Sequence, residues 1–276
     1  MRVMLDVCQV AGRRHRVNIN LDLSLATSYR SLSQQARVVT EAWATNNLYC
    51  IACSSLHIKP TPPNRAAIDF LCPSCEAPYQ LKSSVRPFST RVVDGAYCAM
   101  LRAIEQELTP NLLLLRYSVV TSAVSDLEFT PKFALTTSSL EERTPLSATA
   151  RRAGWVGCNI LLSNIPPDAR IALIKSGKVT PPRLVRAQYR LTVPLSNLTV
   201  AQRGWTLDVL NVVRNLGRSR FSLQDVYAHE QQLAALHPVN RNVRPKIRQQ
   251  LQVLRDLGLV QFLSAGQYRV RQATEV

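Results

Sequence analysis

Two pairs of cysteines constrain the fold of this chain more than any other feature of its sequence. Each pair has two residues between its cysteines, and 18 residues separate the pairs: Cys50, Cys53, Cys72 and Cys75. Four thiolates at this spacing are typical of a tetrahedral zinc site in which protein ligands fill every position. Four unrelated core cysteines are the alternative, but they would not be expected to fall into two such pairs. We therefore predict a structural Zn²⁺ that folds a zinc knuckle over residues 50–75.

Polar residues flank the second cysteine pair on both sides. Asp69 lies three residues before Cys72, and Gln80 and Lys82 follow Cys75 closely. If the knuckle is the tip of a β-hairpin, Asp69 and Gln80 can meet across the strands, and Lys82 projects from the same face as Gln80. Such a face could bind Mg²⁺ through its oxygens and position a water for phosphodiester hydrolysis. The spacing alone is weak evidence, because a solvated strand face would often produce it.

The charge of the chain points to a polyanionic partner. Thirty-four Lys and Arg against 18 Asp and Glu give a formal net charge of +16, which favours nucleic acid as the partner over a basic protein without a ligand. No apolar run reaches the roughly 18 residues of a membrane span, and the first residues do not resemble a secretory signal. We expect a cytoplasmic protein without disulfides, with no membrane association and no obligate protein partner.

The first two thirds of the chain show the pattern of an α/β layer structure. Alternation over residues 17–21 predicts a short strand, and apolar residues at helical spacing predict a helix over about 28–46. Residues 79–82 and 112–120 are predicted strands, the second of them buried. Asp94 could cap a helix that ends before Pro110. This order of elements predicts a sheet covered by helices, with Cys98 and Cys158 as ordinary buried thiols.

The last 75 residues or so have a different pattern, with three helices and a terminal hairpin. The predicted helices span 205–213, a segment opened by Ser222 with Asp225 as its capping partner, and a segment from about 243 to Gly258; the strands are 259–262 and 267–270. This order is typical of a winged helix. Residues 181–198 contain several prolines and are predicted to be a linker or a peripheral excursion.

The third helix of this region has two distinct sides. Apolar residues recur along one side, and the other gathers polar residues that could read bases in a major groove: Arg244, Arg248, Gln249 and Gln252. A solvated helix surface is the alternative. A second candidate DNA contact combines Arg151 and Arg152 with Trp155, whose flat ring could pack against a methyl group while the arginines hold phosphates. Trp155 could equally belong to the core.

Short stretches along nearly the whole chain from about residue 17 onward match a known family. Besides the two cysteine pairs they are Ser33–Arg37, Thr40-Glu41 with Trp43, Asp69-Phe70, Leu81–Ser83, Asp94–Tyr97, Ala150–Trp155, Arg203–Thr206 and Ile247–Gln252. With these motifs the chain resembles the DpnI family of methyl-directed type II restriction endonucleases. The resemblance implies an α/β PD-(D/E)XK nuclease core and a winged-helix reader, which together cut both strands at G-A-T-C sites whose adenine is N6-methylated.

The poor patterning of residues 1–16 predicts a basic N-terminal extension, and the order of elements together with the resemblance predicts a nuclease domain over 17–195 and a winged-helix domain over 196–276. The resemblance also implies roles for single residues. Asp69 and Lys82 fall on catalytic positions, and Gln80 stands where the family has glutamate, so that Asp69 and Gln80 would be the Mg²⁺ ligands. Because an amide oxygen is a weaker Mg²⁺ ligand than a carboxylate, a catalytically inactive or weak reader of methylated DNA remains an alternative. A zinc-bearing protein adaptor is a third reading.

Overall fold

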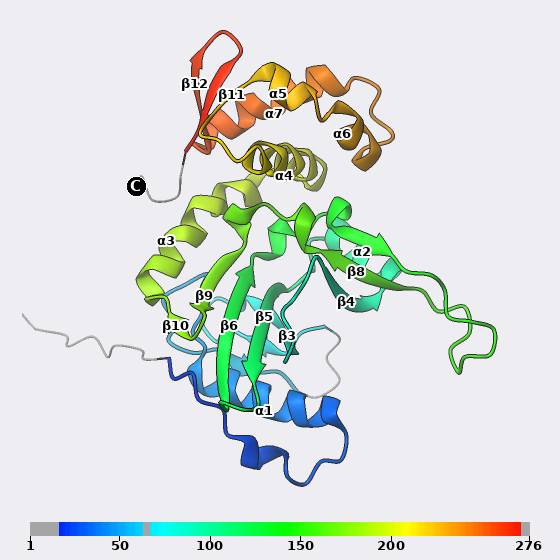
Figure 1. The fold of residues 1–276 in the computed structure, drawn as a ribbon, viewed down its shortest axis with the longest axis vertical. Helices are drawn as coiled ribbons and strands as arrows, with labels where there is room; N and C mark the ends of the chain where they lie inside the picture. The colour runs from blue at the N-terminus through cyan, green and yellow to red at the C-terminus, as the bar shows by residue number, and fades with distance from the viewer. Residues whose placement is uncertain (1–16, 63–66, 272–276) are drawn as a thin grey trace, which may run out of the picture.

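The protein is described from a computed structural model, which covers residues 17–62 and 67–271. The predicted extension over 1–16 lies outside the described residues. An α/β domain comes first and a helix-turn-helix domain follows it, as predicted (Figure 1). No helix within the described ranges combines the length and apolar character needed to cross a membrane.

A seven-stranded sheet forms the centre of the α/β domain. In spatial order its strands are β1 (Lys59–Pro60), β2 (Phe70–Leu71), β3 (Pro78–Ser84), β5 (Asn111–Ser118), β6 (Ala123–Thr130), β9 (Ile171–Lys175) and β10 (Lys178–Val179). β3 and β5 pair in parallel, and the other neighbouring strands pair antiparallel. β3 is therefore joined to β5 by a crossover, which contains β4 (Arg91–Ala96) and α2 (Tyr97–Glu105).

Strand β5 shows that the sheet is buried on both faces, as its run of leucines predicts. Leu113 and Leu115 pack in the core beside α1 (Leu32–Asn47), whereas Leu112 and Leu114 pack in the core that includes α2. Helix α1 is tied to the sheet by a hydrogen bond from Thr40 Oγ1 to Ser83 Oγ on β3, with 3.2 Å between the oxygens. One face of β3 therefore lies against the core beside α1, and the other lies against the core that includes α2.

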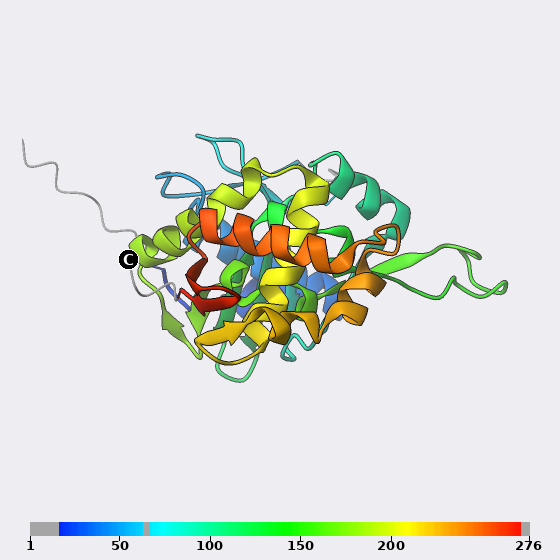
Figure 2. The ribbon, with the colours of Figure 1, turned by 90° about the horizontal axis from the view of Figure 1, so that it is seen from above.

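A second sheet lies beside the crossover. It contains β4, β8 (Gly157–Leu161) and β7 (Leu140–Glu142) in that spatial order. The connection between β7 and β8, residues 143–156, projects from the body of the molecule in both ribbon views (Figures 1 and 2). We call it the arm. The short 3₁₀ helices of the domain are η1 (Leu23–Ala26), η2 (Lys132–Ala134), η3 (Thr137–Ser139), η4 (Leu162–Asn164) and η5 (Pro167–Ala169).

Two of the predicted elements are wrong. Residues 181–198 are not a linker, because they form α3 (Pro182–Thr192) and the 3₁₀ helix η6 (Val193–Asn197). Proline fits the first turn of a helix, where its missing N–H is not needed, and Val185 anchors α3 in the core. Residues 17–21 form no named strand and contribute one isolated bridge, between Asn20 and Ala123.

The helix-turn-helix domain contains four helices and a three-stranded sheet. Its elements are α4 (Val200–Asn215), β11 (Arg220–Ser222), α5 (Leu223–Tyr227), α6 (Glu230–Leu236), α7 (Val243–Asp256), β12 (Val260–Ser264) and β13 (Gln267–Val270). The predicted capping box is present, since the Ser222 side chain and Asp225 exchange hydrogen bonds with each other's backbone N–H at the start of α5. In the view from above, α7 crosses over α4 (Figure 2).

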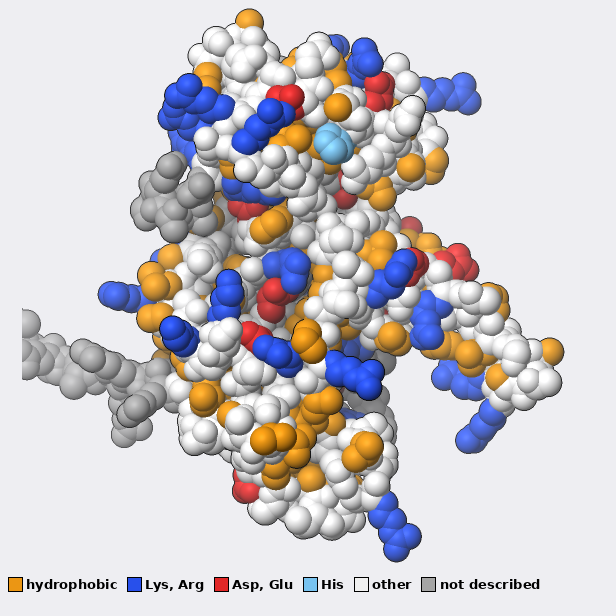
Figure 3. Space-filling view, viewed as in Figure 1, with side chains coloured by type: hydrophobic (Ala, Val, Ile, Leu, Met, Phe, Trp, Pro, Cys, Tyr) orange, Lys and Arg blue, Asp and Glu red, His pale blue; other side chains and the backbone are white. Residues whose placement is uncertain are grey.

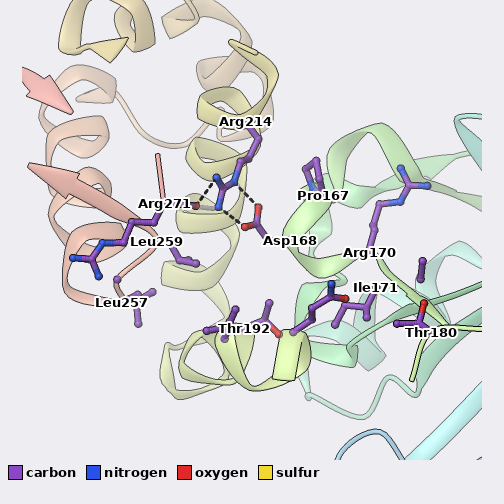
Figure 4. Close-up of a pocket in the computed structure, with 14 residues that line it drawn as sticks. Pro167, Asp168, Arg170, Ile171, Thr180, Thr192, Arg214, Leu257, Leu259 and Arg271 are labelled. Carbon is purple, nitrogen blue, oxygen red and sulfur yellow. Dashed lines mark hydrogen bonds and ion pairs between the residues drawn. The ribbon is translucent and has the colours of Figure 1, made fainter. Parts of the chain in front are cut away.

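Helix α4 joins the two domains. Figure 1 shows it between the α/β domain and the rest of the helix-turn-helix domain, and every residue from 203 to 213 is buried. Polar contacts cross the junction as well. Arg214 forms a two-pronged ion pair with Asp168 and donates to the backbone oxygen of Arg271, 2.9 Å away (Figure 4). Asp208 accepts hydrogen bonds from Ser138 Oγ of the α/β domain, at 2.7 Å, and contacts His237 Nε2 at 2.7 Å.

Candidate functional site

The four cysteines of the two pairs come together in one cluster. Their sulfur atoms all lie within 4.8 Å of one another, and the Cys50–Cys75 and Cys53–Cys72 sulfur distances are both 3.6 Å. A zinc tetrahedron with Zn–S bonds of about 2.3 Å has sulfur atoms about 3.8 Å apart. The cluster is therefore consistent with a structural zinc site, as predicted, and it offers four protein ligands.

The cysteine cluster is braced against strand β3 and helix α3. The Tyr79 hydroxyl accepts a hydrogen bond from the backbone N–H of Ile51 and lies 3.1 Å from Cys50 Sγ. Arg186 on α3 donates to the backbone oxygens of Cys50 and Ser55, at 2.9 and 3.0 Å from Nη2. Because Tyr79 directly precedes Gln80 on β3, the cluster fixes the strand that carries the candidate site.

The β2–β3 hairpin places the three predicted site residues on one face of the sheet. Phe70 pairs with Tyr79, and both point into the core beside α1. Alternation along the strands directs the preceding residue, Asp69, and the following residues, Gln80 and Lys82, to the opposite face. That face carries Leu112 and Leu114, the parallel partners of Gln80 and Lys82 on β5.

The contacts of these three side chains fix their positions. Asp69 Oδ2 accepts a hydrogen bond of 2.7 Å from the backbone N–H of Leu81, the residue between Gln80 and Lys82. Gln80 is buried, with 8% of its surface exposed, and its Nε2 lies 3.3 Å from Asp94 Oδ1. Lys82 Nζ forms an ion pair of 2.6 Å with the same Asp94 oxygen. The structure thus adds Asp94 to the predicted set.

Asp94 lies beside the predicted set and does not cap a helix, which corrects the prediction from the sequence. Helix α2 begins at Tyr97, Ala96 is its N-cap residue, and no side chain caps it. Asp94 lies instead on β4, where the pairing with β8 is irregular between Val93 and Ala96. Val92 is buried and Val93 is exposed, so alternation along β4 turns the Asp94 side chain inward, and the local sequence does not show which strand it meets there.

The two spare cysteines within the described residues differ in exposure. Cys158 is fully buried next to the site, and its Sγ donates to the Gly95 backbone oxygen at 3.4 Å. Burial, assisted by the nearby Asp94 charge, raises the pKa of Cys158 to about 11, so this thiol is protonated at neutral pH and unreactive. Cys98 is exposed, which corrects the expectation that it is buried.

Helix α7 has the two sides that its sequence predicts. Val243, Ile247, Leu251 and Leu254 are buried, whereas the residues of the predicted reading face are exposed: Arg244, Arg248, Gln249 and Gln252. Two of the arginines already have partners. Arg244 forms an ion pair with Glu230, with 2.7 Å between Nε and Oε2, and Arg248 Nη1 donates to the Tyr227 hydroxyl at 2.8 Å. These contacts hold both side chains close to the helix in the free protein.

Residues Arg151, Arg152 and Trp155 lie on the arm and not in the core. Both arginines are exposed, and the guanidinium carbon of Arg152 lies 4.9 Å from the centre of the half-buried Trp155 ring. Gly154 has a positive φ of 74°, which permits the tight turn that was expected beside the tryptophan. Lys and Arg side chains are scattered over the face shown in Figure 3, including the arm, and do not gather into one patch.

Comparison with protein-family models identifies the family of both domains. A model of the DpnI Dam-replacing family matches residues 17–198, and a model of the Dam-replacing HTH domain matches residues 201–270. The chain belongs to the DpnI family. DNA binding is implied for this DpnI-family protein, both by the family and by its HTH domain, and the family as a whole implies a restriction endonuclease.

Proposed function

We propose that this DpnI-family protein is a Mg²⁺-dependent endonuclease that cuts both strands of DNA at G-A-T-C sites containing N6-methyladenine. The observation that carries the proposal is the position of Asp69, Gln80 and Lys82 on one face of the β2–β3 hairpin, next to a buried carboxylate. A carboxylate, a carbonyl oxygen and an ammonium in this arrangement suit phosphodiester hydrolysis of the PD-(D/E)XK type.

The donor atoms of the site fit a hard divalent cation. Within the described part of the chain, Asp69 Oδ1 and Gln80 Oε1 accept no hydrogen bond, so both oxygens are free to bind Mg²⁺. Bound Mg²⁺ would polarise the scissile phosphate and acidify a water molecule. The thiolates of the cysteine cluster are soft ligands, and they suit a structural Zn²⁺ that stays out of the reaction.

Residues of β3 and β4 orient the Asp69 carboxylate and place the positive charge of Lys82. The Leu81 N–H fixes one oxygen of Asp69 and so orients the carboxylate along β3. Lys82 presents its ammonium to the scissile phosphate and its attacking water, where a positive charge stabilises developing negative charge. Asp94 holds Lys82 in this place through the 2.6 Å ion pair, which is largely shielded from solvent.

Two separate surfaces are proposed to recognise the substrate. On α7, Arg244, Arg248, Gln249 and Gln252 are proposed to enter the major groove, where arginine pairs with guanine and glutamine with adenine. On the arm, Arg151 and Arg152 are proposed to hold phosphates while Trp155 packs against the adenine methyl group. The net charge of +16 favours the approach of both surfaces to DNA.

The test separates cutting from binding on one short methylated duplex. Lys82→Ala should abolish Mg²⁺-dependent cutting and leave the dissociation constant of the duplex, measured in Ca²⁺, within about twofold. Lys178→Ala, on the exposed edge strand β10, is the matched control and should cut like the parent. If Lys82→Ala cuts as fast as the parent, the assignment of this face is wrong.

A second function is favoured by one observation. Gln80 is neutral where the family has a carboxylate, which weakens the affinity for Mg²⁺. A catalytically inactive or weak reader of methylated DNA would bind the duplex with the same preference for methylation, and the parent and Lys82→Ala would then be indistinguishable in every assay. A protein adaptor would instead show no dependence of DNA affinity on salt.

A further inference from the structure

Asp94 is a buried carboxylate whose position on β4 is unusual. Val93 pairs with Asn159 and Ala96 with Gly157, so two residues of β4, Asp94 and Gly95, face a single residue of β8. Val92 is buried, Val93 is 59% exposed and only 7% of the Asp94 side chain is exposed, so the alternation along β4 directs the carboxylate inward to the face of β3.

Both hydrogen bonds that the Asp94 carboxylate accepts from the described residues involve one of its two oxygens. Its Oδ1 accepts hydrogen bonds from the Lys82 ammonium, at 2.6 Å, and from the Gln80 amide nitrogen, at 3.3 Å. Among the described residues, no group donates a hydrogen bond to Oδ2. Gln80 donates its amide nitrogen to Asp94, so its own carbonyl oxygen is left without a partner although the side chain is more than nine-tenths buried. Neither oxygen is wholly shielded from solvent, so water or a cation can reach both.

The charges of the site are also incomplete without a second carboxylate. Position 80 carries a neutral amide, so among the described residues on this face of β2 and β3 the carboxylate is that of Asp69. Divalent cations with oxygen ligands need carboxylate charge for affinity. Asp94, in contact with both Gln80 and Lys82, brings that charge from a different strand.

We propose that Asp94 is a ligand of the catalytic divalent cation, and that beside Asp69 and the Gln80 carbonyl oxygen it supplies the second carboxylate, which the neutral Gln80 cannot. This inference rests on the proposed nuclease function for the identity of the cation. Asp94 would hold the cation through Oδ2, while its Oδ1 keeps the ion pair that positions Lys82.

The experiment measures Mn²⁺ binding to the zinc-loaded full chain by the electron paramagnetic resonance signal of free Mn²⁺. Asp94→Asn should weaken Mn²⁺ binding at least tenfold, and Gln80→Glu in the same chain should restore most of the affinity. Asp126→Asn, a half-exposed partner of Arg116 on β6, is the control and should bind like the parent. If Asp94→Asn does not fold, Asp94→Ser gives the same comparison, because its hydroxyl still accepts hydrogen bonds.

The outcomes separate this inference from the proposed function. Unchanged Mn²⁺ affinity in Asp94→Asn, or no Mn²⁺ binding by the parent, overturns the role of Asp94 even if the parent cuts methylated DNA. Weakened affinity in Asp94→Asn together with a parent that cuts no DNA supports the metal site and rejects the nuclease function.

Discussion

The ion pair between Asp168 and Arg214 should hold the two domains together. Both side chains are largely buried, with 11% and 13% of their surfaces exposed, and Arg214 donates from two nitrogens to the carboxylate. Asp168→Asn removes the negative charge, keeps the shape and leaves the arginine charge buried. Breaking a buried ion pair in this way costs about 3–5 kcal/mol. Arg214 keeps its hydrogen bond to the Arg271 backbone oxygen, so its charge is not left wholly without a partner. We therefore expect a loss at the lower end of this range, about 3 kcal/mol.

Urea unfolding followed by tryptophan fluorescence measures this loss. Trp205 on α4 reports on the junction, because it is 6% exposed and stacks on His237 with 3.9 Å between ring centres. With a slope of about 2–3 kcal/mol per molar urea, a loss of 3 kcal/mol lowers the midpoint by about 1 M. Replacing both partners, Asp168→Leu with Arg214→Met, should recover most of the stability.

An exposed ion pair in the same chain provides the control. Arg91 and Glu141 are 59% and 32% exposed, so solvent screens their attraction and Glu141→Gln should lower the midpoint far less than Asp168→Asn. If Asp168→Asn and Glu141→Gln lower the midpoint equally, the contact between the domains is not a buried ion pair in solution, and the reasoning is wrong.

Three further outcomes follow from individual contacts. Removal of zinc by a strong chelator should unfold the knuckle and abolish cutting, with one Zn²⁺ per chain found by atomic absorption before treatment; cutting that persists without zinc would contradict this. Gly157→Ala places a Cβ 2.8 Å from two ring carbons of Trp155, so it should displace the ring, shift its fluorescence and reduce the preference for methylated duplex several-fold; an unchanged preference would remove Trp155 from methyl recognition. The Arg203 guanidinium lowers the pKa of Glu107, so their ion pair stabilises the fold at neutral pH and is lost as the pH falls through that lowered pKa. The melting temperatures of the parent and Glu107→Gln should therefore converge only in acid, below the ordinary pKa of glutamate, and convergence at neutral pH would show that the pair contributes nothing.

Much of the fold could be predicted because local patterns agree with the tertiary structure. The cysteine spacing, the leucine run of β5 and the apolar stripe of α7 each specify one element and its buried side. The Ser222 capping box marks the start of α5 through hydrogen bonds within four residues. Such signals need no knowledge of distant parts of the chain.

The errors have a common cause in contacts between distant segments. The prolines at 181 and 182 predict a linker, but Pro182 opens α3 and packing of Val185 stabilises that helix. Asp94 is predicted to cap a helix, but it lies on a strand whose place depends on pairing with β8, more than 60 residues away. Residues of one hairpin can be grouped from the sequence, whereas a neighbour from a second strand cannot.

Digestion of plasmid DNA tests the central claim most directly. G-A-T-C-bearing plasmid, fully adenine-methylated or unmethylated, is incubated with Mg²⁺ and either the parent or Gln80→Glu, and the linear products are quantified. The account predicts double-strand cutting of the methylated plasmid alone, faster with Gln80→Glu because a carboxylate binds Mg²⁺ more tightly than an amide. The contradicting result is tight binding of methylated DNA by both proteins, without cutting by either in Mg²⁺ or Mn²⁺.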